Sequence, residues 1–389
     1  MRKGWEYKKL GEVCEVVTGT TPKTNIPEYW GKGHYWVTPA ELNDTTVYID
    51  KTERQITDEA LSKTKLRLLP VGTVLLSSRA PIGKVAIANA EMYCNQGFKN
   101  CICSEAIYNK YLFYFLRLKK DYLNSLGRGA TFKEISKSIV ESIKIPLPPK
   151  STQLAIVSEL DKINELIRLK KEQLKDFDNL AQSLFFEMFG DPVENEKGWE
   201  VKKLNDICDV RDGTHDSPKY LQNSEYILIT SKNIVNGSID FENVNYISEE
   251  DYIKINKRSK VDNGDIIMPM IGTIGNPIIA HIDGTHKFCI KNVALIKFLA
   301  DSTVNNMFIV NLMRCSSFSS YLLNQNKGGT QKFVALGAIR KLPIPLPPLF
   351  LQQLFAQRIE QIEREKSEVQ KSIQDLETLL ASRMQYWFE

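Results

Sequence analysis

The chain has 389 residues, a formal net charge of +4 and a hydrophobic fraction of 42%. This length allows two or three domains with cores of their own, and the composition is that of an ordinary soluble protein. The small net charge permits nucleic-acid binding only where basic residues cluster. Residues 1–6 contain no apolar signal core and no apolar run has the length of a membrane span, so we expect neither secretion nor membrane insertion.

Seven cysteines are scattered along the chain and do not form the paired C-x2–4-C units of a zinc site. They are Cys14, Cys94, Cys101, Cys103, Cys208, Cys289 and Cys315. The i, i+2 spacing of Cys101 and Cys103 places both on one face of a strand. We expect buried, reduced thiols, which fits a cytoplasmic protein without a metal site.

The first half of the chain is predicted to combine short strands with helices and to end in one long helix. In chain order, its elements are β-rich runs at 35–39 and 47–49, a strand at 72–78, a glycine turn at 80–83, a further strand, a helical piece at 109–126, a second glycine turn at 128–131, the proline motif IPLPP at 145–149 and a helix at 156–188. The prolines suit the extended lead-in to that helix and cannot lie inside it.

Apolar residues in the long helix recur at alternating steps of four and three, the heptad pattern of a coiled coil. Its seam is Leu160, Ile163, Ile167, Lys170, Leu174 and Phe177, continued by Ile156 on one side and Ala181, Leu184 and Met188 on the other. A helix of this extent is about 50 Å long. The alternative is an amphipathic helix packed on a separate globular core, but the sustained rhythm favours pairing of two long helices.

Phe189-Gly190-Asp191-Pro192 ends the helix, and the chain then repeats itself. GWEYKKL at 4–10 returns as GWEVKKL at 198–204, an offset of 194 residues, and Gly83 matches Gly275 at an offset of 192. IPLPP returns at 344–348, 199 residues after its first copy. One internal duplication with small insertions and deletions explains these offsets, and it predicts a tandem pair of related domains.

The second half repeats the predicted elements of the first. They are β-rich runs at 226–231 and 239–241, a strand at 264–268, glycine turns at 272–275 and 327–330, a helical piece at 305–323 and a second long helix with the seam Ile359, Ile362, Lys366, Val369, Ile373 and Leu376. Lys170 and Lys366 interrupt the two seams. They either extend their ammonium groups past the partner helix to water or penalise misaligned pairing, in which case Lys170→Leu should stabilise the chain while permitting wrong assemblies.

Motifs of catalysis are absent from the sequence. It contains neither G-x-x-x-x-G-K-[ST] nor G-x-G-x-x-G. The four histidines have no i, i+4 spacing or carboxylate companion typical of metal or triad chemistry. We therefore predict no catalytic residue in this chain.

The glycine turns carry cations and small polar groups, which suit phosphates and base edges. The candidate DNA-binding residues are Arg79, Lys84, Arg128, Thr131 and Lys133 in the first half, and Thr273, Asn276, Lys327, Thr330, Gln331 and Lys332 in the second. Plain surface turns are the alternative, but the turns recur in both copies beside hydroxyl and basic residues. Arg79 aligns with Ile271, so the two halves cannot contact DNA identically.

The duplicated GWExKKL opening, the doubled IPLPPxxxQ lead-in and the joint at 186–192 resemble the specificity subunit of type I restriction–modification systems over essentially the whole chain. The resemblance implies an α+β fold with a pseudo-twofold duplication. Two tandem homologous target-recognition domains, small β-sheets with helices, would be joined by two long helices that form an antiparallel coiled coil. The expected boundaries are 1–149 for the first domain, 150–189 for the central spacer helix, 190–348 for the second domain and 349–389 for the C-terminal spacer helix.

The resemblance also implies a function. Each domain would read one part of a split, asymmetric sequence in double-stranded DNA, and two such readers on a rod could reach segments about 35 Å apart. The spacer helices would dock the modification subunits, and the complex would include restriction subunits. The chain itself would bind no cofactor, because S-adenosylmethionine, ATP and Mg belong to those partners. The alternative is a coiled-coil scaffold with two partner-binding domains and no role on DNA.

Overall fold

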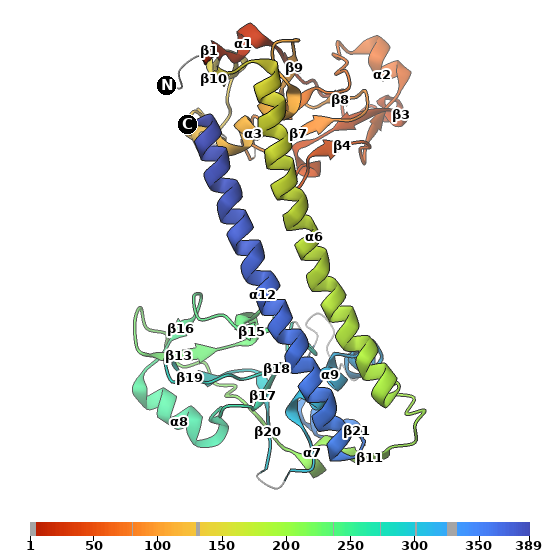
Figure 1. Ribbon diagram of the computed structural model, residues 1–389, viewed down its shortest axis with the longest axis vertical. Coiled ribbons are helices and arrows are strands. Elements are labelled where there is room, and N and C mark those ends of the chain that lie inside the picture. The colour runs from red at the N-terminus through yellow and green to blue at the C-terminus, as the bar shows by residue number, and fades with distance from the viewer. Residues whose placement is uncertain are drawn as a thin grey trace. The chain divides into compact units, whose positions relative to one another are not determined.

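A computed structural model describes residues 5–79, 81–129, 133–235, 237–272, 274–299, 302–324 and 333–389. The chain divides into two compact units. The first unit contains residues 1–171 and 371–389, and the second unit contains residues 172–370. Each unit therefore holds one half of the duplication and a part of both long helices (Figure 1).

The first unit is built on mixed β-sheets covered by short helices. Its strands are β1 (Glu6–Lys9), β2 (Cys14–Thr18), β3 (Trp30–Val37), β4 (Tyr48–Ile49), β5 (Gln55–Ile56), β6 (Val74–Leu76), β7 (Val85–Ala88), β8 (Tyr93–Cys94), β9 (Lys99–Cys103) and β10 (Lys144–Leu147). Its short helices are α1 (Leu10–Val13), α2 (Asp58–Lys63), α3 (Asn109–Leu118), α4 (Lys120–Ser125) and α5 (Lys137–Ser142), with 3-10 turns at Pro27–Tyr29 and Pro39–Glu41. A five-stranded sheet runs β2-β9-β6-β7-β4, and a three-stranded sheet runs β5-β3-β8.

The second unit repeats this plan with fewer strands in its main sheet. Its strands are β11 (Glu200–Lys203), β12 (Asp209–Asp212), β13 (Tyr226–Ile229), β14 (Ile234–Val235), β15 (Ser238–Ile239), β16 (Asn245–Tyr246), β17 (Ile266–Pro269), β18 (Ile278–Ile279), β19 (Lys287–Ile290), β20 (Val293–Lys297) and β21 (Pro343–Leu346). Its short helices are α7 (Leu204–Ile207), α8 (Glu249–Ser259), α9 (Asn306–Arg314), α10 (Ser316–Asn324) and α11 (Leu336–Arg340), with a 3-10 turn at Ser231–Asn233. The main sheet runs β12-β20-β17-β18, and the second sheet runs β16-β13-β19.

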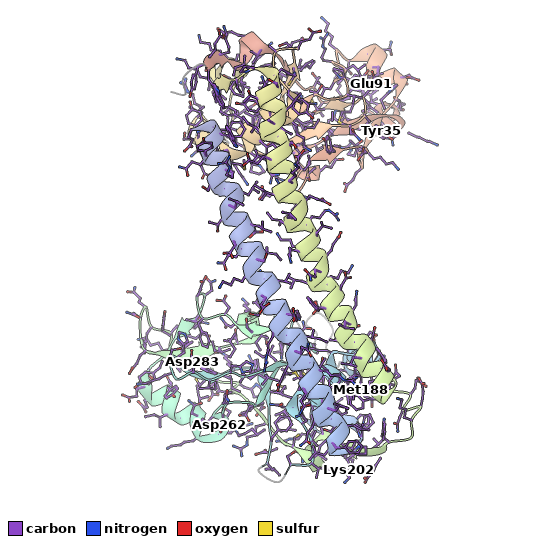
Figure 2. All side chains as sticks on the ribbon, viewed as in Figure 1. Tyr35, Glu91, Met188, Lys202, Asp262 and Asp283 are labelled. Carbon is purple, nitrogen blue, oxygen red and sulfur yellow. The ribbon has the colours of Figure 1, made fainter. Side chains whose placement is uncertain are left out.

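The two most strongly repeated motifs of the sequence are partners in the fold. β1, from the GWExKKL opening, pairs antiparallel with β10, from the proline motif, and Tyr7 lies opposite Pro146. β11 and β21 repeat this pairing, with Val201 opposite Pro345. Proline is tolerated here because each sheet has only two strands, so every strand has a free edge where the missing N–H costs nothing. Figure 2 labels Lys202 on β11.

The helical pieces expected at 109–126 and 305–323 are confirmed as helical, but each is interrupted once. Each is two helices, α3 and α4 in the first unit and α9 and α10 in the second. The break comes at Lys119, with ψ 15°, and at Cys315, with ψ 137°. The change of direction lets α4 bury Leu123 and lets α10 bury Phe318 in the respective cores.

The long helices are α6 (Lys150–Phe189) and α12 (Leu349–Phe388), each of 40 residues. They pair antiparallel. In the first unit, Lys171 of α6 lies 2.8 Å from Glu377 near the end of α12. In the second unit, Lys366 nearer the start of α12 lies 2.8 Å from Asp178 of α6.

The predicted seam residues are all buried or half-buried, so the seam is the inner side of both helices. Buried are Leu160, Ile163, Ile167, Ile359, Ile362, Val369 and Ile373, and half-buried are Lys170, Leu174, Phe177, Lys366 and Leu376. The Lys366 ammonium bonds Asp178 at 2.8 Å and Glu363 at 3.1 Å. Burial opposes its charge, but these two carboxylates outweigh burial and raise the pKa of Lys366. Its ammonium is therefore ion-paired with a residue of the other helix.

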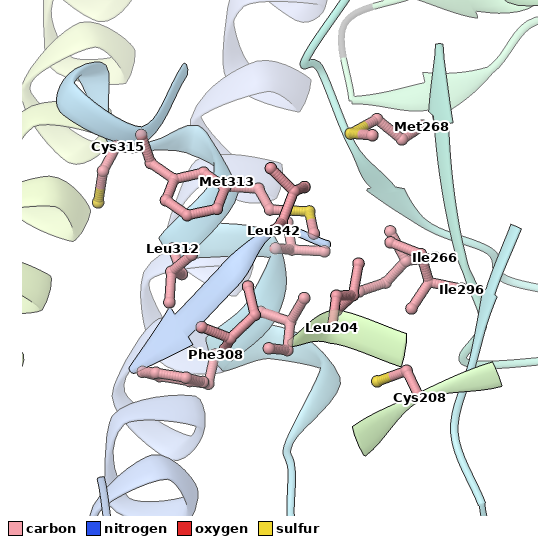
Figure 3. Close-up of a cluster of buried hydrophobic side chains, with 14 of the residues drawn as sticks. Leu204, Cys208, Ile266, Met268, Ile296, Phe308, Leu312, Met313, Cys315 and Leu342 are labelled. Atoms are coloured by element: carbon pink, nitrogen blue, oxygen red, sulfur yellow. The ribbon is translucent and has the colours of Figure 1, made fainter. Parts of the chain in front are cut away.

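The beginning of one long helix and the end of the other seal each core. In the first unit, Leu160 of α6 and Phe388 of α12 join one buried cluster. In the second unit, Ile359 of α12 and both Phe185 and Phe189 of α6 do the same. Figure 3 shows part of this second cluster, where Ile266 and Ile296 lie near Leu204, Met268 lies further along β17 and Phe308 extends from α9. Figure 2 labels Met188 near the end of α6.

A buried glutamine locks each long helix to its own domain. Gln153 accepts a hydrogen bond from the Tyr108 N–H at 2.8 Å and donates to the Pro148 carbonyl at 2.9 Å. Gln352 repeats both bonds, with the Asn305 N–H at 2.9 Å and the Pro347 carbonyl at 2.8 Å. This explains why the glutamine of IPLPPxxxQ recurs with the prolines: its amide satisfies backbone groups that the prolines and the helix start would leave buried and unpaired.

All seven cysteines are free thiols, and all except the half-buried Cys103 are buried. Burial raises the pKa of the Cys208, Cys289 and Cys315 thiols to about 12, so they stay protonated at neutral pH. Within the described residues, no helix is long and apolar enough to cross a membrane.

Candidate nucleic-acid interface

The segments that flank the two glycine turns of the first domain lie side by side. The backbone of Arg128 exchanges two hydrogen bonds of 3.0 Å with that of Glu134, and the Ile135 N–H donates to the Ser78 carbonyl at 3.0 Å. Arg79 forms a β-bridge with Glu134 as well. These bonds bring the backbones of Arg79 and Arg128 together on one hairpin residue, Glu134.

The charge around Glu134 is only partly neutralised from within. The Glu134 carboxylate bonds the buried Lys99 ammonium at 2.8 Å and lies 4.0 Å from the Arg79 guanidinium. The bond from Lys99 and the nearby Arg79 hold the pKa of Glu134 below its usual range. Arg128 and Lys133 are exposed, and the Arg79 side chain is 35% exposed. One carboxylate therefore faces several cations, which leaves a net positive patch suited to phosphates.

Lys84 differs from the other candidates. Its ammonium donates a hydrogen bond of 3.0 Å to the Pro39 carbonyl, and the residue is half-buried. Lys84 thus holds the 3-10 turn at Pro39–Glu41, and a contact with DNA would have to replace that bond.

Several candidates of the second domain lie outside the described residues. These are Thr273, Lys327, Thr330, Gln331 and Lys332, together with Thr131 of the first domain. The frame around them repeats the first domain, because the Val334 N–H donates to the Met270 carbonyl at 3.0 Å just as Ile135 does to Ser78. Asn276 is exposed and borders a cavity of about 870 Å³ that Asp178 of α6 and Lys366 of α12 also line.

A second feature of both domains was not recognised as a site from the sequence. In each domain two backbone segments cross in contact: residues 19–20 with 94–95 in the first domain, and residues 213–214 with 290–291 in the second. A glycine is required at each crossing. A Cβ on Gly19 would lie 1.9 Å from the Asn95 carbonyl oxygen, and one on Gly213 would lie 2.4 Å from the Ile290 carbonyl oxygen. The repeated Gly-Thr pair, at 19–20 and 213–214, was visible as part of the duplication, but nothing local to it indicated what it contacts.

Aromatic rings adjoin the crossing in the first domain. The Trp36 indole N–H donates to the Thr20 carbonyl at 3.2 Å, and Trp30 packs edge-on against Trp36 with ring centroids 4.8 Å apart. The exposed Arg54 guanidinium lies 3.7 Å from the centre of the Trp30 ring. A guanidinium stacked in this way loses little side-chain freedom when it binds an anion.

Comparison with known proteins identifies the family. The "Type I restriction modification DNA specificity domain" matches residues 2–176 and again 196–378. The chain belongs to the family of type I restriction–modification specificity subunits. The type I restriction enzyme MjaIX specificity subunit of Methanocaldococcus jannaschii is 33% identical over 380 residues, which cover 91% of this chain and 85% of that protein. The EcoR124I/EcoR124II specificity subunit of Escherichia coli is 32% identical over 168 residues, or 41% of each chain.

Solved structures support the same fold. A structure from work on complex assembly and conformational transition of a type I restriction–modification system aligns with a TM-score of 0.63 and 18% identity, over 99% of this chain and 97% of its own. The S subunit from M. genitalium aligns with a TM-score of 0.53 and 13% identity, over 99% and 96%. The specificity subunit recognises the DNA target and assembles the complex. The scaffold alternative without DNA finds no support. Among the described residues, no group of three or more His, Cys, Asp or Glu side chains could hold a metal ion.

Proposed function

We propose that this specificity subunit reads a bipartite, asymmetric sequence in double-stranded DNA, one part with each domain, and docks modification and restriction subunits. The observation that carries the proposal is that both domains repeat the same backbone contact but place different side chains next to it. The bonds of Ile135 to Ser78 and of Val334 to Met270 repeat the same backbone contact. The next residue is Arg79 in the first domain and Ile271 in the second. Because the two domains share this backbone arrangement but present different side chains, we expect them to recognise two different half-sites and not the two halves of a palindrome.

The chain is proposed to work without catalytic residues of its own. The family membership and the absence of catalytic motifs from the sequence support this. Methyl transfer from S-adenosylmethionine and the chemistry of ATP and Mg would then belong to the partner subunits. We place the protein in the cytoplasm, where those subunits and the DNA meet.

The long helices are the proposed docking surface. On α6, within the first unit, Leu154, Leu166 and Leu169 are each between 46% and 48% exposed although their neighbours on the seam are buried. Leu154 and Leu169 lie on the side of the helix away from the seam, and Leu166 lies on the flank of the seam next to them. An apolar stripe on the outer side of a coiled coil supports contact with another protein chain.

The test exchanges one domain. Replacing residues 1–149 by the matching part of another specificity subunit should change one part of the methylated sequence and leave the other part intact. Genome-wide mapping of methylated bases, with the wild-type gene and without it, provides the reference. A change in both parts, or a continuous palindromic motif for the wild type, would contradict the proposal. Binding of the purified subunit to a target duplex should also weaken steeply with salt, as counterion release requires.

A further inference from the structure

We infer that the loop crossing in each domain is a base-reading site, with Gln96 as the reading residue of the first domain and Asn292 of the second. The inference rests on the proposed function, since it assigns residues to the two half-sites. Neither amide was a candidate from the sequence, because neither lies in a glycine-rich turn with cations.

The crossings hold both amides in fixed places. In the first domain, the Thr20 N–H donates to the Cys94 carbonyl at 2.9 Å and the Asn95 N–H donates to the Val37 carbonyl at 3.2 Å. In the second, the Thr214 N–H donates to the Ile290 carbonyl and the Lys291 N–H to the Ile229 carbonyl, at 3.0 and 2.9 Å. Gln96 and Asn292 each follow directly on these bonded segments. A reading residue held by backbone bonds loses little freedom on binding.

The first amide has hydrogen-bonding capacity left over. The Thr21 hydroxyl donates to Gln96 Oε1, and this is the contact the structure gives for the exposed Gln96 side chain within the described residues. The oxygen keeps one lone pair and the amide nitrogen keeps both donors. A carboxamide with one acceptor and one donor free matches the N6 and N7 edge of adenine in the major groove.

The second amide is positioned by a buried charge. Asp212 is 4% exposed, and its carboxylate bonds the exposed Arg258 and His215 Nε2, the latter at 2.8 Å. The other ring nitrogen of His215, Nδ1, lies 2.9 Å from Asn292 Oδ1. The imidazole is thus held between a carboxylate and the amide, so His215 is a positioning residue for Asn292. Among the described residues, the Asn292 amide nitrogen has no partner.

The backbone next to each reading residue adjoins a cationic residue. In the first domain, a Cβ on Gly97 would lie 3.5 Å from the Cγ of Arg79, so the residue after Gln96 packs against that arginine. In the second, Lys291 precedes Asn292 and is only 8% exposed. Its ammonium bonds the Ser217 hydroxyl at 2.6 Å, and no described carboxylate lies within ion-pair distance. A buried ammonium with a neutral partner is electrostatically incomplete, and a DNA phosphate would complete it.

The test uses shape-preserving variants, Gln96→Glu and Asn292→Asp, which replace an amide nitrogen by an oxygen. Aspartate is preferred to alanine at 292 because Asn292 has a φ of 55°, a conformation that Asn and Asp tolerate. The matched controls are Gln222→Glu and Asn205→Asp, which make the same change at exposed positions outside the two crossings and the long helices. Methylated bases are mapped in cells that carry the whole complex, and binding of the purified subunit to target and unrelated duplexes is measured.

We expect Gln96→Glu to alter one position in the part of the motif that depends on residues 1–149, and Asn292→Asp to alter one position in the other part. Each should weaken target binding about tenfold to a hundredfold, with a smaller loss on unrelated duplex, while both controls match the wild type. An unchanged motif and affinity in a variant with wild-type thermal unfolding would overturn the inference. Equal losses on target and unrelated duplex would do so too, because they would indicate phosphate contact alone. A wild type without any gene-dependent motif would instead refute the proposed function.

Discussion

The two units hold their long helix by different chemistry at matching positions. In the first unit, Asp161 of α6 accepts hydrogen bonds from the Lys110 ammonium at 2.7 Å and the Tyr114 hydroxyl at 2.6 Å. Asn164, one turn further along α6, donates to the same hydroxyl at 3.2 Å. Burial, together with the Asp161 carboxylate, raises the pKa of Tyr114, so the phenol remains a donor at any physiological pH. The first domain is thus tied to α6 by a connected polar network.

The second unit lacks this network although its backbone is the same. Asn109 and Asn306 donate to the carbonyls of Gly72 and Gly264, both at 3.0 Å, so α3 and α9 correspond at an offset of 197 residues. Lys110 and Tyr114 are then matched by Met307 and Asn311, and Asp161 is matched by Glu360 of α12. The smaller Asn311 lines the cavity of about 870 Å³ next to the helices.

The comparison teaches that duplication preserved backbone contacts and left side chains free to diverge. The glutamine lock and the proline strand pairing are the same in both units because they satisfy main-chain groups. The polar network joins side chains alone, so its absence from the second unit leaves no main-chain group of that unit without the partner it provided. Three experiments would break or sharpen this contrast.

The largest expected effect concerns the ends of the long helices. Phe185 of α6 is buried, with its ring centroid 5.1 Å from that of Phe189 and 5.6 Å from those of Phe308 and Phe355. Phe185→Ala should cost about 3–5 kcal/mol of unfolding free energy. The matching position in the first unit is Met384, which is only half-buried, so Met384→Ala should cost about 1–2 kcal/mol. Urea unfolding with hydrogen exchange in α9 and α3 measures both, and equal costs would show that the two ends are equivalent.

A smaller effect is expected from the polar network. Asp161→Ala removes the acceptor for Lys110 and Tyr114 and leaves a mostly buried ammonium without its carboxylate, at a cost of about 2–3 kcal/mol. Glu360→Ala at the matching position of α12 should change stability by no more than about 0.5 kcal/mol, because that side chain is exposed. Thermal unfolding of the two variants beside the wild type tests the contrast. Similar losses would mean that Glu360 has a role the structure does not show.

The smallest effect depends on pH. In the first unit, Glu159 of α6 accepts hydrogen bonds from the Arg383 guanidinium and, at 3.1 Å, from the Trp387 indole N–H of α12. The bond to Arg383 holds the pKa of Glu159 below its usual value of about 4.3. A depressed pKa means that the stabilisation is complete above the unfolded value and is lost as the pH falls through the lower, folded value.

Acid should therefore weaken the contact between Glu159 and Arg383 in the first unit. The second unit should show no such effect, because the matching residues, Arg358 and Leu184, cannot form an ion pair. Titrating the wild type from pH 6 toward pH 3 should change the Trp387 environment, read by fluorescence with Trp387→Phe as the blank. Glu159→Gln should remove that transition. A transition that persists unchanged in Glu159→Gln would assign it to other carboxylates.

The sequence predicted the features that repeat or follow a period. The duplication, both seams and the proline lead-ins were legible because spacing alone encodes them. The breaks at Lys119 and Cys315 could not be predicted in this way. Residues of ordinary helix propensity surround both, and each change of direction is set by packing of the second helix against the core. Arg79 and Arg128 were predicted from local cations and glycines, and their contact with DNA stays a prediction. Gln96 and Asn292 were missed because the segments that place them are about 75 residues apart in the chain, and only tertiary structure brings those segments into contact.

The sealing of each core by the far end of the other long helix has a consequence for synthesis. The cluster that closes over Leu160 in the first unit includes Phe388. While the ribosome is still making α12, the domain translated first lacks part of its apolar lining, and the domain translated second already has Phe185 and Phe189 available. The second domain should then complete its core before the first. The first domain should expose apolar surface to chaperones until the last turns of α12 are synthesised.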